Sequence, residues 1–590
     1  MNRRDFARTA VLAVTAVLAA DACSPGHSNV GPGDLPGAPP NKLTLDPEGL
    51  QSTGPAAPLP GAQTGGTLNV TWRNDFPHYD PVKVYTSPDD AVFRLINRRL
   101  TVLKQNDDGS MVLVGDLATD TGTASDGGST WKYTLKDGVT YADGTPIVSR
   151  DIKYAVERSF DSRFAMGPKW VQQWLIGNDD YNSVYQGPYK GQELGPDKIE
   201  TPDDKTIIFH LAAPQSDFPF AVSMTQTVPV RKALDTDQNA LDANGLGDMI
   251  TGPYKIDSHA VDRTLVLVRN PHWDPKTDPV RHQYVDKMHF QFGVQPKQET
   301  DQLRANMDPH SAALYNQIDV DQVQDILADS ELKQRTIDAE LNFVMSFQIN
   351  NARVTDPNVR KAIATAFPKQ DVINTQGGPY YGAIATTFSP RAAVGYSPQP
   401  NPYGVGDNGD PQLAKQILTA AGKLGYVVNV CWDSTPAADR MGAPIKRALE
   451  AAGFKVNLDP VADKGYYDAI EHLQNPYDLI WYQWAPDWPT NRTVYSALFS
   501  SGQVMEGGSA VAQVKSQQVD DSINRVQAIQ DIEAQGAQYM PLDQKIQKDY
   551  GAAIPVAYVR KQMMFGSKVR GVRVDVISTS IDLSHIYLER

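Results

Sequence analysis

The sequence predicts a mixed α/β protein, and three observations lead to that prediction. The chain has 590 residues, enough to bury a large core, and its 41% hydrophobic and 21% charged content is ordinary for a soluble globular protein. From Thr67 onward, short strand-like runs alternate with amphipathic helix-like runs. The strand-like runs include 67–72, 206–211 and 264–268, and the helix-like runs include 356–367, 410–422 and 443–453.

Charge and motif content exclude several functions. The formal net charge of -14 argues against a nucleic-acid partner, because phosphate binding needs a basic surface. The ten histidines are scattered, and the sequence contains no H-E-x-x-H, paired-cysteine, G-x-S-x-G or G-x-x-x-x-G-K motif. We therefore predict no metal, no cofactor and no enzymatic activity.

The first 22 residues have the layout of an export signal, with a basic start and an apolar run over 10–20 that is too short to span a membrane. Arg3-Arg4 resembles a twin-arginine signal, and a general secretory signal is the alternative. Cys23 occupies the place of the acylated cysteine of bacterial lipoproteins, which predicts anchoring to the outer face of the cell membrane. Because Asp21 departs from the usual Leu-Ala-Gly pattern, a cleaved signal with an incidental Cys23 is the alternative.

The segment after the signal is rich in Pro, Gly, Ser and Ala and poor in residues that a core could bury. We therefore expect residues 23–64 to form a disordered tether. The second cysteine, Cys431, lies in a strand-like run and is interpreted as a small buried hydrophobe, so no disulfide is predicted.

The most informative stretch of the chain is 131–158, WKYTLKDGVTYADGTPIVSRDIKYAVER. From Trp131 to Leu135, large apolar residues alternate with polar ones and predict a strand, and two Asp-Gly pairs then supply turns. A helix is expected to begin with Ser149 as its N-cap, with Asp151 in the first turn, where the helix dipole favours negative charge.

This block resembles the signature of the family 5 solute-binding proteins, the dipeptide and oligopeptide receptors of ABC importers. Further motifs of that family follow in order: GGTLNV at Gly65, TGPYKI at Thr251, RNPHWDP at Arg269, NNARVTDPNVRKAIATAF at Asn350, YDLIWYQWAPDW at Tyr477 and AIPVAY at Ala553. The resemblance implies a two-lobed, hinged fold like that of periplasmic binding proteins, with discontinuous lobes and an additional subdomain.

The resemblance also implies the course of the chain. Lobe I is expected to combine 65–103, 226–293 and 553–590. The additional subdomain is expected at 104–225 and lobe II at 294–552. The implied function is capture of a peptide between the lobes by hinge closure, followed by delivery to an ABC permease with a separate ATPase. We expect an extracytoplasmic monomer.

The W-x-x-D motif of these receptors falls on Trp484 and Asp487, and the resemblance implies that the acid pairs with the α-ammonium of a peptide. Gln483 and Ala485, on either side of Trp484, are the neighbouring contacts. The alternative for Asp487 is a cap for the turn before Pro489.

Other candidates for ligand contact lie elsewhere in the chain. Tyr85, Thr86 and Ser87 are expected to form the lobe I wall, with a surface loop as the alternative. Tyr558 and Trp174, the latter together with Trp170, are further candidates, for which ordinary core packing is the alternative.

The chain departs from some oligopeptide receptors, because Trp481 occupies the place of an arginine that holds a peptide carboxylate. Trp481, Trp484, Trp488 and Tyr482 could instead stack on a ligand. The alternative function is therefore a receptor for an oligosaccharide or another non-peptide solute, including a metal chelate. An exported enzyme on the same scaffold and a sensory or adhesive protein are the remaining alternatives.

Overall fold

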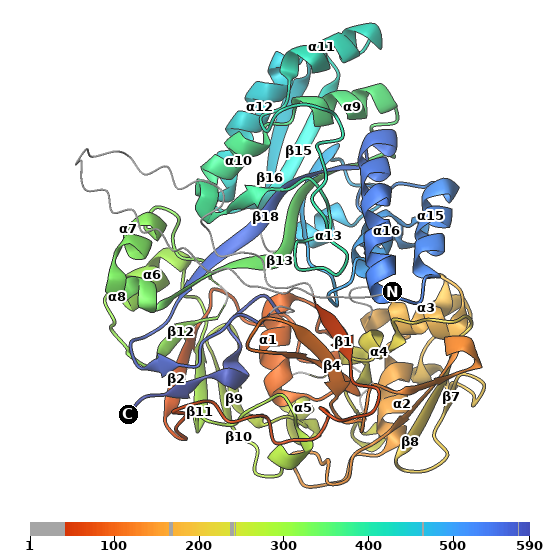
Figure 1. Ribbon diagram of the computed structural model, residues 1–590, viewed down its shortest axis with the longest axis vertical. Coiled ribbons are helices and arrows are strands. Elements are labelled where there is room, and N and C mark those ends of the chain that lie inside the picture. The colour runs from red at the N-terminus through yellow and green to blue at the C-terminus, as the bar shows by residue number, and fades with distance from the viewer. Residues whose placement is uncertain are drawn as a thin grey trace, which may run out of the picture. The chain divides into compact units, whose positions relative to one another are not determined.

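Two large β-sheets covered by helices organise the chain (Figure 1). This computed structural model describes residues 42–164, 169–235, 241, 243–314, 316–462, 465–575 and 578–590. The predicted export signal, Cys23 and the first part of the predicted tether lie outside these residues. The predicted α/β class is confirmed.

Lobe I is built on a mixed five-stranded sheet in the order β12-β2-β11-β10-β9. β2 pairs in parallel with β11 and β12, and β10 pairs antiparallel with β9 and β11. The strands are β2 (Thr67–Thr71), β9 (Tyr254–Ala260), β10 (Thr264–Arg269), β11 (Lys287–Gln291) and β12 (Ser311–Ala313). A separate three-stranded sheet contains β1 (Leu43–Leu45), β3 (Thr101–Gln105) and β4 (Met111–Gly115).

Lobe II is built on a six-stranded sheet in the order β14-β18-β13-β17-β15-β16. Its strands are β13 (Thr336–Ile349), β14 (Gly382–Ile384), β15 (Val427–Ser434), β16 (Lys455–Ala462), β17 (Leu479–Trp484) and β18 (Ala553–Met564). Cys431 is buried in β15, as predicted. The two long strands β13 and β18 pair antiparallel over most of their length.

Helices cover these sheets, and four of them, α9 to α12, pack in one apolar core against the six-stranded sheet of lobe II (Figure 1). Helices of lobe I and the subdomain are α1 (Ser87–Ile96), α2 (Ser149–Arg158), α3 (Trp170–Ile176), α4 (Phe218–Ala221), α5 (Ala243–Leu246), α6 (Pro296–Arg304), α7 (Val323–Ala328) and α8 (Ser330–Gln334). Helices of lobe II are α9 (Pro357–Ala366), α10 (Lys369–Thr375), α11 (Pro411–Ala420), α12 (Gly442–Ala451), α13 (Tyr466–Ile470), α14 (Arg492–Phe499), α15 (Gln517–Gln527) and α16 (Ile532–Lys545).

The additional subdomain carries a four-stranded sheet in the order β5-β6-β8-β7. These strands are β5 (Thr123–Ser125), β6 (Thr130–Thr134), β7 (Ile199–Glu200) and β8 (Thr206–His210). The strand and helix predicted from the signature are confirmed as β6 and α2. The predicted cap is wrong, because Val148 is the N-cap residue and Ser149 is helical. The Ser149 hydroxyl donates instead to the Asp203 carbonyl at 2.5 Å.

Residues 42–66 form a strap that follows lobe I, whereas the sequence predicted a disordered tether up to residue 64. β1 pairs in parallel with β4, and the Gly54 and Ala56 amides donate to the carbonyls of Lys276 and Asp278 at 3.0 and 3.1 Å. Composition predicted disorder because the segment has little apolar surface to bury. The backbone hydrogen bonds to lobe I satisfy the polar groups of the segment and hold it in place without burial of large apolar side chains.

Strand pairing also departs from the predicted lobe boundaries. β12 lies within predicted lobe II but pairs with β2 of lobe I. β18 lies within predicted lobe I but pairs with β13 and β14 of lobe II. β13 and β18 pair along their length, and the end of this pair lies beside β12 of lobe I. The predicted boundary at residue 553 therefore assigns two paired strands to different lobes.

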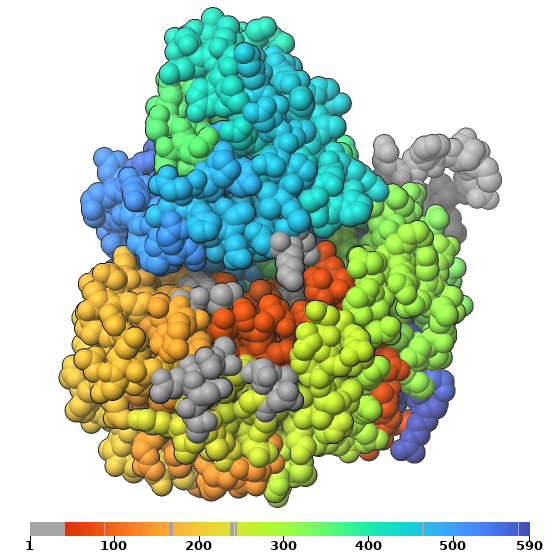
Figure 2. All heavy atoms as spheres, turned by 180° about the vertical axis from the view of Figure 1, so that it is seen from behind, coloured from red at the N-terminus to blue at the C-terminus, as the bar shows by residue number. Residues whose placement is uncertain are grey.

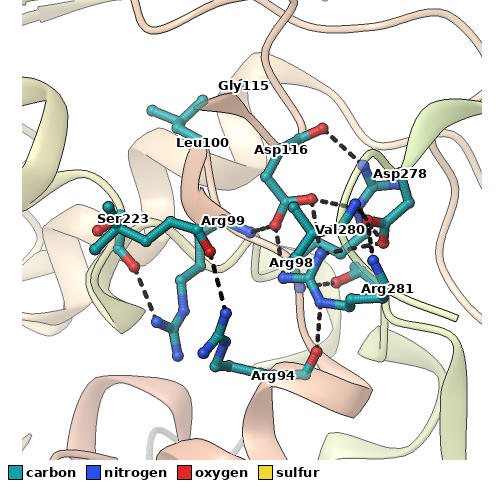
Figure 3. A network of polar contacts seen from close by, with 12 residues as sticks. Arg94, Arg98, Arg99, Leu100, Gly115, Asp116, Ser223, Asp278, Val280 and Arg281 are labelled. Carbon is teal, nitrogen blue, oxygen red and sulfur yellow. Dashed lines mark hydrogen bonds and ion pairs between the residues drawn. The ribbon is translucent and has the colours of Figure 1, made fainter. Parts of the chain in front are cut away.

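A buried ionic network joins the segments that follow α1, β4 and β10 (Figure 3). Asp116 accepts a hydrogen bond from Arg98 Nε at 2.7 Å and from Arg281 Nη2 at 2.9 Å. Arg281 also contacts Asp278 at 3.1 Å, and all four side chains are at most 2% exposed. The charges of Arg281 and Arg98 outweigh burial and hold the pKa of Asp116 well below its usual range. The network fixes lobe I at the point where the subdomain begins.

Candidate functional site

The W-x-x-D motif lies where β17 ends and turns toward α14. β17 is a central strand between β13 and β15, and Trp484 is the last residue in register, opposite Val344. Pro486 follows and lacks a backbone donor, which suits a chain that leaves the sheet. Asp487 therefore sits on a turn held by a rigid strand and helix.

Three distant parts of the chain meet at the part-buried carboxylate of Asp487. The Tyr85 hydroxyl donates to its Oδ1 at 2.7 Å, and the Trp170 indole Nε1 donates to its Oδ2 at 2.7 Å. Tyr85 precedes α1 in lobe I, and Trp170 is the first residue of α3 in the subdomain. The backbone amide of Asp487 donates to Thr493 Oγ1 at 3.1 Å, which fixes the turn.

Burial raises the pKa of the Asp487 carboxyl to about 6, and the hydrogen bonds from Trp170 and Tyr85 and the charge of Lys169 oppose that rise. The carboxylate is ionised at neutral pH and has about four lone-pair sites, of which the two donors take two. The site can therefore accept further hydrogen bonds from a cation.

Two more ionisable side chains belong to this group and were missed in the sequence: Lys169 interacts with Asp487, and Glu471 interacts with Lys169. Burial lowers the pKa of Lys169 to about 7, although the charges of Glu471 and Asp487 act to raise it. Burial and the charge of Asp468 raise the pKa of Glu471 to about 8. Lys169 immediately precedes Trp170, but no local pattern could have placed it beside an acid more than 300 positions away. Glu471 lies much closer to Asp487 in the chain but belongs to no motif.

Trp484 forms an aromatic wall beside the acid. Its ring stacks on Tyr482, with centroids 6.0 Å apart and planes at 12°, and lies 6.5 Å from the ring of Tyr85. The Trp484 indole donates to the Thr493 carbonyl at 3.0 Å, so both Trp484 and Asp487 are fixed by the same residue.

The other predicted contacts divide into two groups. Gln483 and Ala485 are half-buried beside Trp484, Thr86 is exposed, and Ser87 is the half-buried first residue of α1. Tyr558 and Trp174 are packed in the interior instead. Tyr558 is 2% exposed and shares a hydrogen bond with Thr387 Oγ1 at 2.9 Å, and Trp174 packs against Trp170.

The aromatic slab considered from the sequence does not form as one surface. Trp488 is fully buried and contacts Trp170 and Trp174 of the subdomain, and Trp481 packs edge-on against Tyr466. Because adjacent residues of a strand point to opposite faces, Trp481 and Tyr482 are separated as the alternation requires. Trp484 and Tyr482 therefore remain as the stacked pair on the side of Tyr85, the residue that donates to Asp487.

A family model described as bacterial extracellular solute-binding proteins, family 5, matches residues 112–506. The chain belongs to this family. This family 5 protein is a solute receptor and not an enzyme, and the two-lobed fold predicted from the sequence is confirmed. Within the part of the chain that the structure describes, no helix combines the length and apolar character needed to cross a bilayer.

Relatives of this family 5 protein are described as peptide-binding proteins. It is 24% identical over 422 residues to a probable D,D-dipeptide-binding periplasmic protein of Escherichia coli, a match that covers 69% of this chain and 72% of that one. It is 24% identical over 446 residues to the periplasmic murein peptide-binding protein of Escherichia coli, which covers 72% of this chain and 75% of that one.

Solved structures share the fold of this family 5 protein. A clavulanic acid biosynthesis oligopeptide-binding protein superimposes with a TM-score of 0.80 at 24% identity, covering 92% of this chain and 99% of the other. The Helicobacter pylori protein DppA, in complex with the peptide STSA, superimposes with a TM-score of 0.70 at 19% identity, covering 90% of this chain and 99% of the other.

Proposed function

We propose that this protein captures peptides between its lobes and delivers them to an ABC permease that works with a separate ATPase. The observation that carries the proposal is the Asp487 carboxylate, which is held by Tyr85 and Trp170 and keeps acceptor capacity. A peptide α-ammonium presents donors that such a carboxylate binds through charge-assisted hydrogen bonds. The peptide-binding descriptions of the relatives support the same ligand class.

The neighbouring residues would complete the contact with the first residue of the peptide. Trp484 would form the wall of its pocket, with Gln483 beside it. Because β17 leaves its ladder after Trp484, the backbone of Ala485 is where an extended peptide would add hydrogen bonds. Thr86 and Ser87 would contact the peptide from lobe I.

Closure of the lobes is the proposed mechanism. Tyr85 and Trp170 reach Asp487 from lobe I and the subdomain, so the complete site exists only when these parts meet lobe II. A peptide that binds this arrangement more tightly than the open one shifts the equilibrium toward closure. The permease would then recognise the closed form of a monomeric receptor.

Calorimetry with a tetrapeptide and its N-acetylated form tests the role of Asp487. The free amine should strengthen binding by about 1.5–3 kcal/mol, the range of a hydrogen bond to a charged group. Asp487→Ala should remove that difference, whereas Asp321→Ala, at a surface acid paired with Arg440, should keep it. Equal affinity of the wild type for the two peptides would exclude an ammonium site at Asp487.

The site of attachment to the membrane is a separate part of the proposal. We infer that Cys23 is acylated after export and holds the receptor at the outer face of the membrane. Intact-mass measurement of the protein from its own host should reveal the lipid, and Cys23→Ser should release the protein from the membrane fraction. An unmodified Cys23, or membrane attachment that survives Cys23→Ser, would contradict the anchor.

A further inference from the structure

Trp488, the residue after Asp487, is inserted from lobe II into an aromatic socket on the subdomain. Its side chain has no exposed surface. Its ring stacks on Phe220, with centroids 6.2 Å apart and planes at 13°, and meets Trp170 and Trp174 edge-on at 5.9 and 6.3 Å. Trp170 of this socket is also the indole donor to Asp487. The subdomain and the ligand-binding turn are therefore in direct contact.

A fully buried acid of the subdomain holds the same turn. Asp217 accepts hydrogen bonds at Oδ2 from Trp488 Nε1 at 2.9 Å and from Thr490 Oγ1 at 3.3 Å. Its Oδ1 lies 3.7 Å from Arg492 Nη1, and the Arg492 side chain is only 3% exposed. One carboxylate of the subdomain thus contacts two residues of the turn between β17 and α14 and the first residue of α14.

The buried guanidinium of Arg492 has the Asp217 carboxylate as its counter-charge. Its guanidinium lies 4.8 Å from the ring of Trp174, and its Nη2 donates to Gln215. Among the described residues, its buried Nε and Nη1 find no hydrogen-bond acceptor. Asp217 is the acid within ion-pair distance of this arginine. A buried arginine without its counter-charge is strongly destabilising, because burial removes water from the guanidinium.

We propose that Asp217, Trp488 and Arg492 form a clasp that closes the subdomain onto lobe II and positions Asp487 for its ligand. The inference rests on the proposed function, because it assigns a regulator to the same binding turn. When the subdomain and lobe II separate, water hydrates Asp217 and Arg492. When they meet, the two charges must pair. Figure 2 shows the orange and yellow surface that includes the subdomain beneath the blue surface of lobe II.

The clasp acts on ligand binding without touching the ligand. Asp217 is a positioning residue that reaches Asp487 through the neighbouring Trp488. Removal of the Asp217 carboxylate penalises only the closed arrangement, because the open one leaves Arg492 hydrated. Apparent affinity scales with the population of the competent state, so every ligand should lose the same factor. The preference for a free ammonium should remain, since Asp487 is intact.

Three variants separate the clasp from general effects on the fold. Asp217→Ala removes both the charge and the acceptor for Trp488. Asp217→Asn removes the charge but keeps a carbonyl acceptor. Asp204→Ala is the matched control, because Asp204 is an acid of the same subdomain whose ion pair with Arg150 is 63% exposed on both sides. Each variant is compared with the wild type by small-angle X-ray scattering and by calorimetry.

Asp217→Ala should expand the peptide-free protein in scattering and weaken binding of the tetrapeptide and its N-acetylated form at least tenfold, with the ratio between them unchanged. Saturating peptide should restore the wild-type radius of gyration. Asp217→Asn should show smaller changes of radius and affinity in the same direction. It supplies the test if Asp217→Ala does not fold. Asp204→Ala should behave as wild type.

Two outcomes would overturn the clasp. An unchanged radius and affinity in both Asp217 variants would show that closure does not depend on this acid. A changed ratio between the two peptides would place Asp217 in the ammonium site instead. If the wild type binds neither peptide, the proposed function fails, while expansion of Asp217→Ala in scattering still supports the clasp.

Discussion

The hydroxyl of Tyr85 lies 2.7 Å from the carboxylate of Asp487, although 402 positions separate the two residues in the chain. Trp170, which belongs to the subdomain, donates to the other carboxylate oxygen of Asp487, also at 2.7 Å. Lobe I, the subdomain and lobe II therefore each supply one member of a single hydrogen-bonded group. The two hydrogen bonds to the acid therefore form only where lobe I and the subdomain meet lobe II.

Peptide binding should depend on pH with a midpoint near the pKa of Asp487, which burial raises to about 6. A protonated carboxyl does not attract an ammonium, so affinity should fall about tenfold per pH unit below 6. Lys169, whose pKa is about 7, faces the same acid and should add a weaker change near neutrality. Calorimetry from pH 5 to 8 measures both. Flat affinity over this range, or the same profile in Asp487→Asn, would contradict the assignment.

Replacement of Asp487 by Asn should stabilise the protein at neutral pH. The folded-state pKa of about 6 lies above the usual value of 3.8, so the bound proton stabilises the fold fully at low pH and less as pH rises through 6. The Asn side chain would be uncharged at every pH, so the variant should gain on the order of 1–3 kcal/mol in free energy of unfolding at pH 7. Thermal unfolding should show a higher Tm for Asp487→Asn at pH 7 and none of this gain at pH 4. A lower Tm at pH 7 would oppose this account.

Loss of Asp116 should destabilise lobe I, because Arg98 and Arg281 would stay buried with only one of their two shared acids, Asp278. Asp116→Ala should cost about 3 kcal/mol or more. Because the pKa of Asp116 is lowered on folding, its contribution is present above the unfolded pKa and is lost as pH falls below it. Urea unfolding of Asp116→Ala at pH 7 and pH 3 measures both effects. The exposed pair of Arg150 and Asp204 is the control, for which at most about 1 kcal/mol is expected.

Gly536→Ala should destabilise the protein even though Gly536 lies inside α16. Helix propensity alone predicts a gain of about 1 kcal/mol. An added Cβ, however, would lie 2.2 Å from the Val394 carbonyl oxygen, which is backbone and cannot turn away. We expect a net loss of about 1–3 kcal/mol in chemical denaturation. Gly406→Ala, which meets no atom within 4 Å, is the control and should be neutral or slightly stabilising. Stabilisation at Gly536 would show that α16 can shift.

Local patterns predicted the elements whose structure is set by their own residues. The alternation after Trp131 placed β6, and the polar start at Ser149 with the acid at Asp151 placed α2. The cap at Ser149 was mispredicted because a carbonyl from a distant turn, that of Asp203, takes its hydroxyl. Composition alone cannot reveal such a partner.

The site was predictable where it follows a motif and not where it depends on lobe contact. Asp487 is part of W-x-x-D, but Lys169 and Glu471 belong to no motif, and Asp217 lies in an unremarkable loop. Lys169 and Asp217 come close to the turn after β17 only because the subdomain meets lobe II. Trp488 looked like a ligand-stacking residue in sequence, because an aromatic beside a binding acid gives no indication of which surface will bury it.

The strap along lobe I limits how far the receptor can travel from its proposed anchor. If Cys23 is acylated, the described fold begins at residue 42 and not at the predicted residue 65, because β1 is already paired with β4. At about 3.5 Å per residue, those 19 steps (42 minus 23) reach roughly 65 Å at most. Because the described chain begins beside β4, an anchor at Cys23 would restrict both the distance from the membrane and the side of lobe I that lies nearest to it.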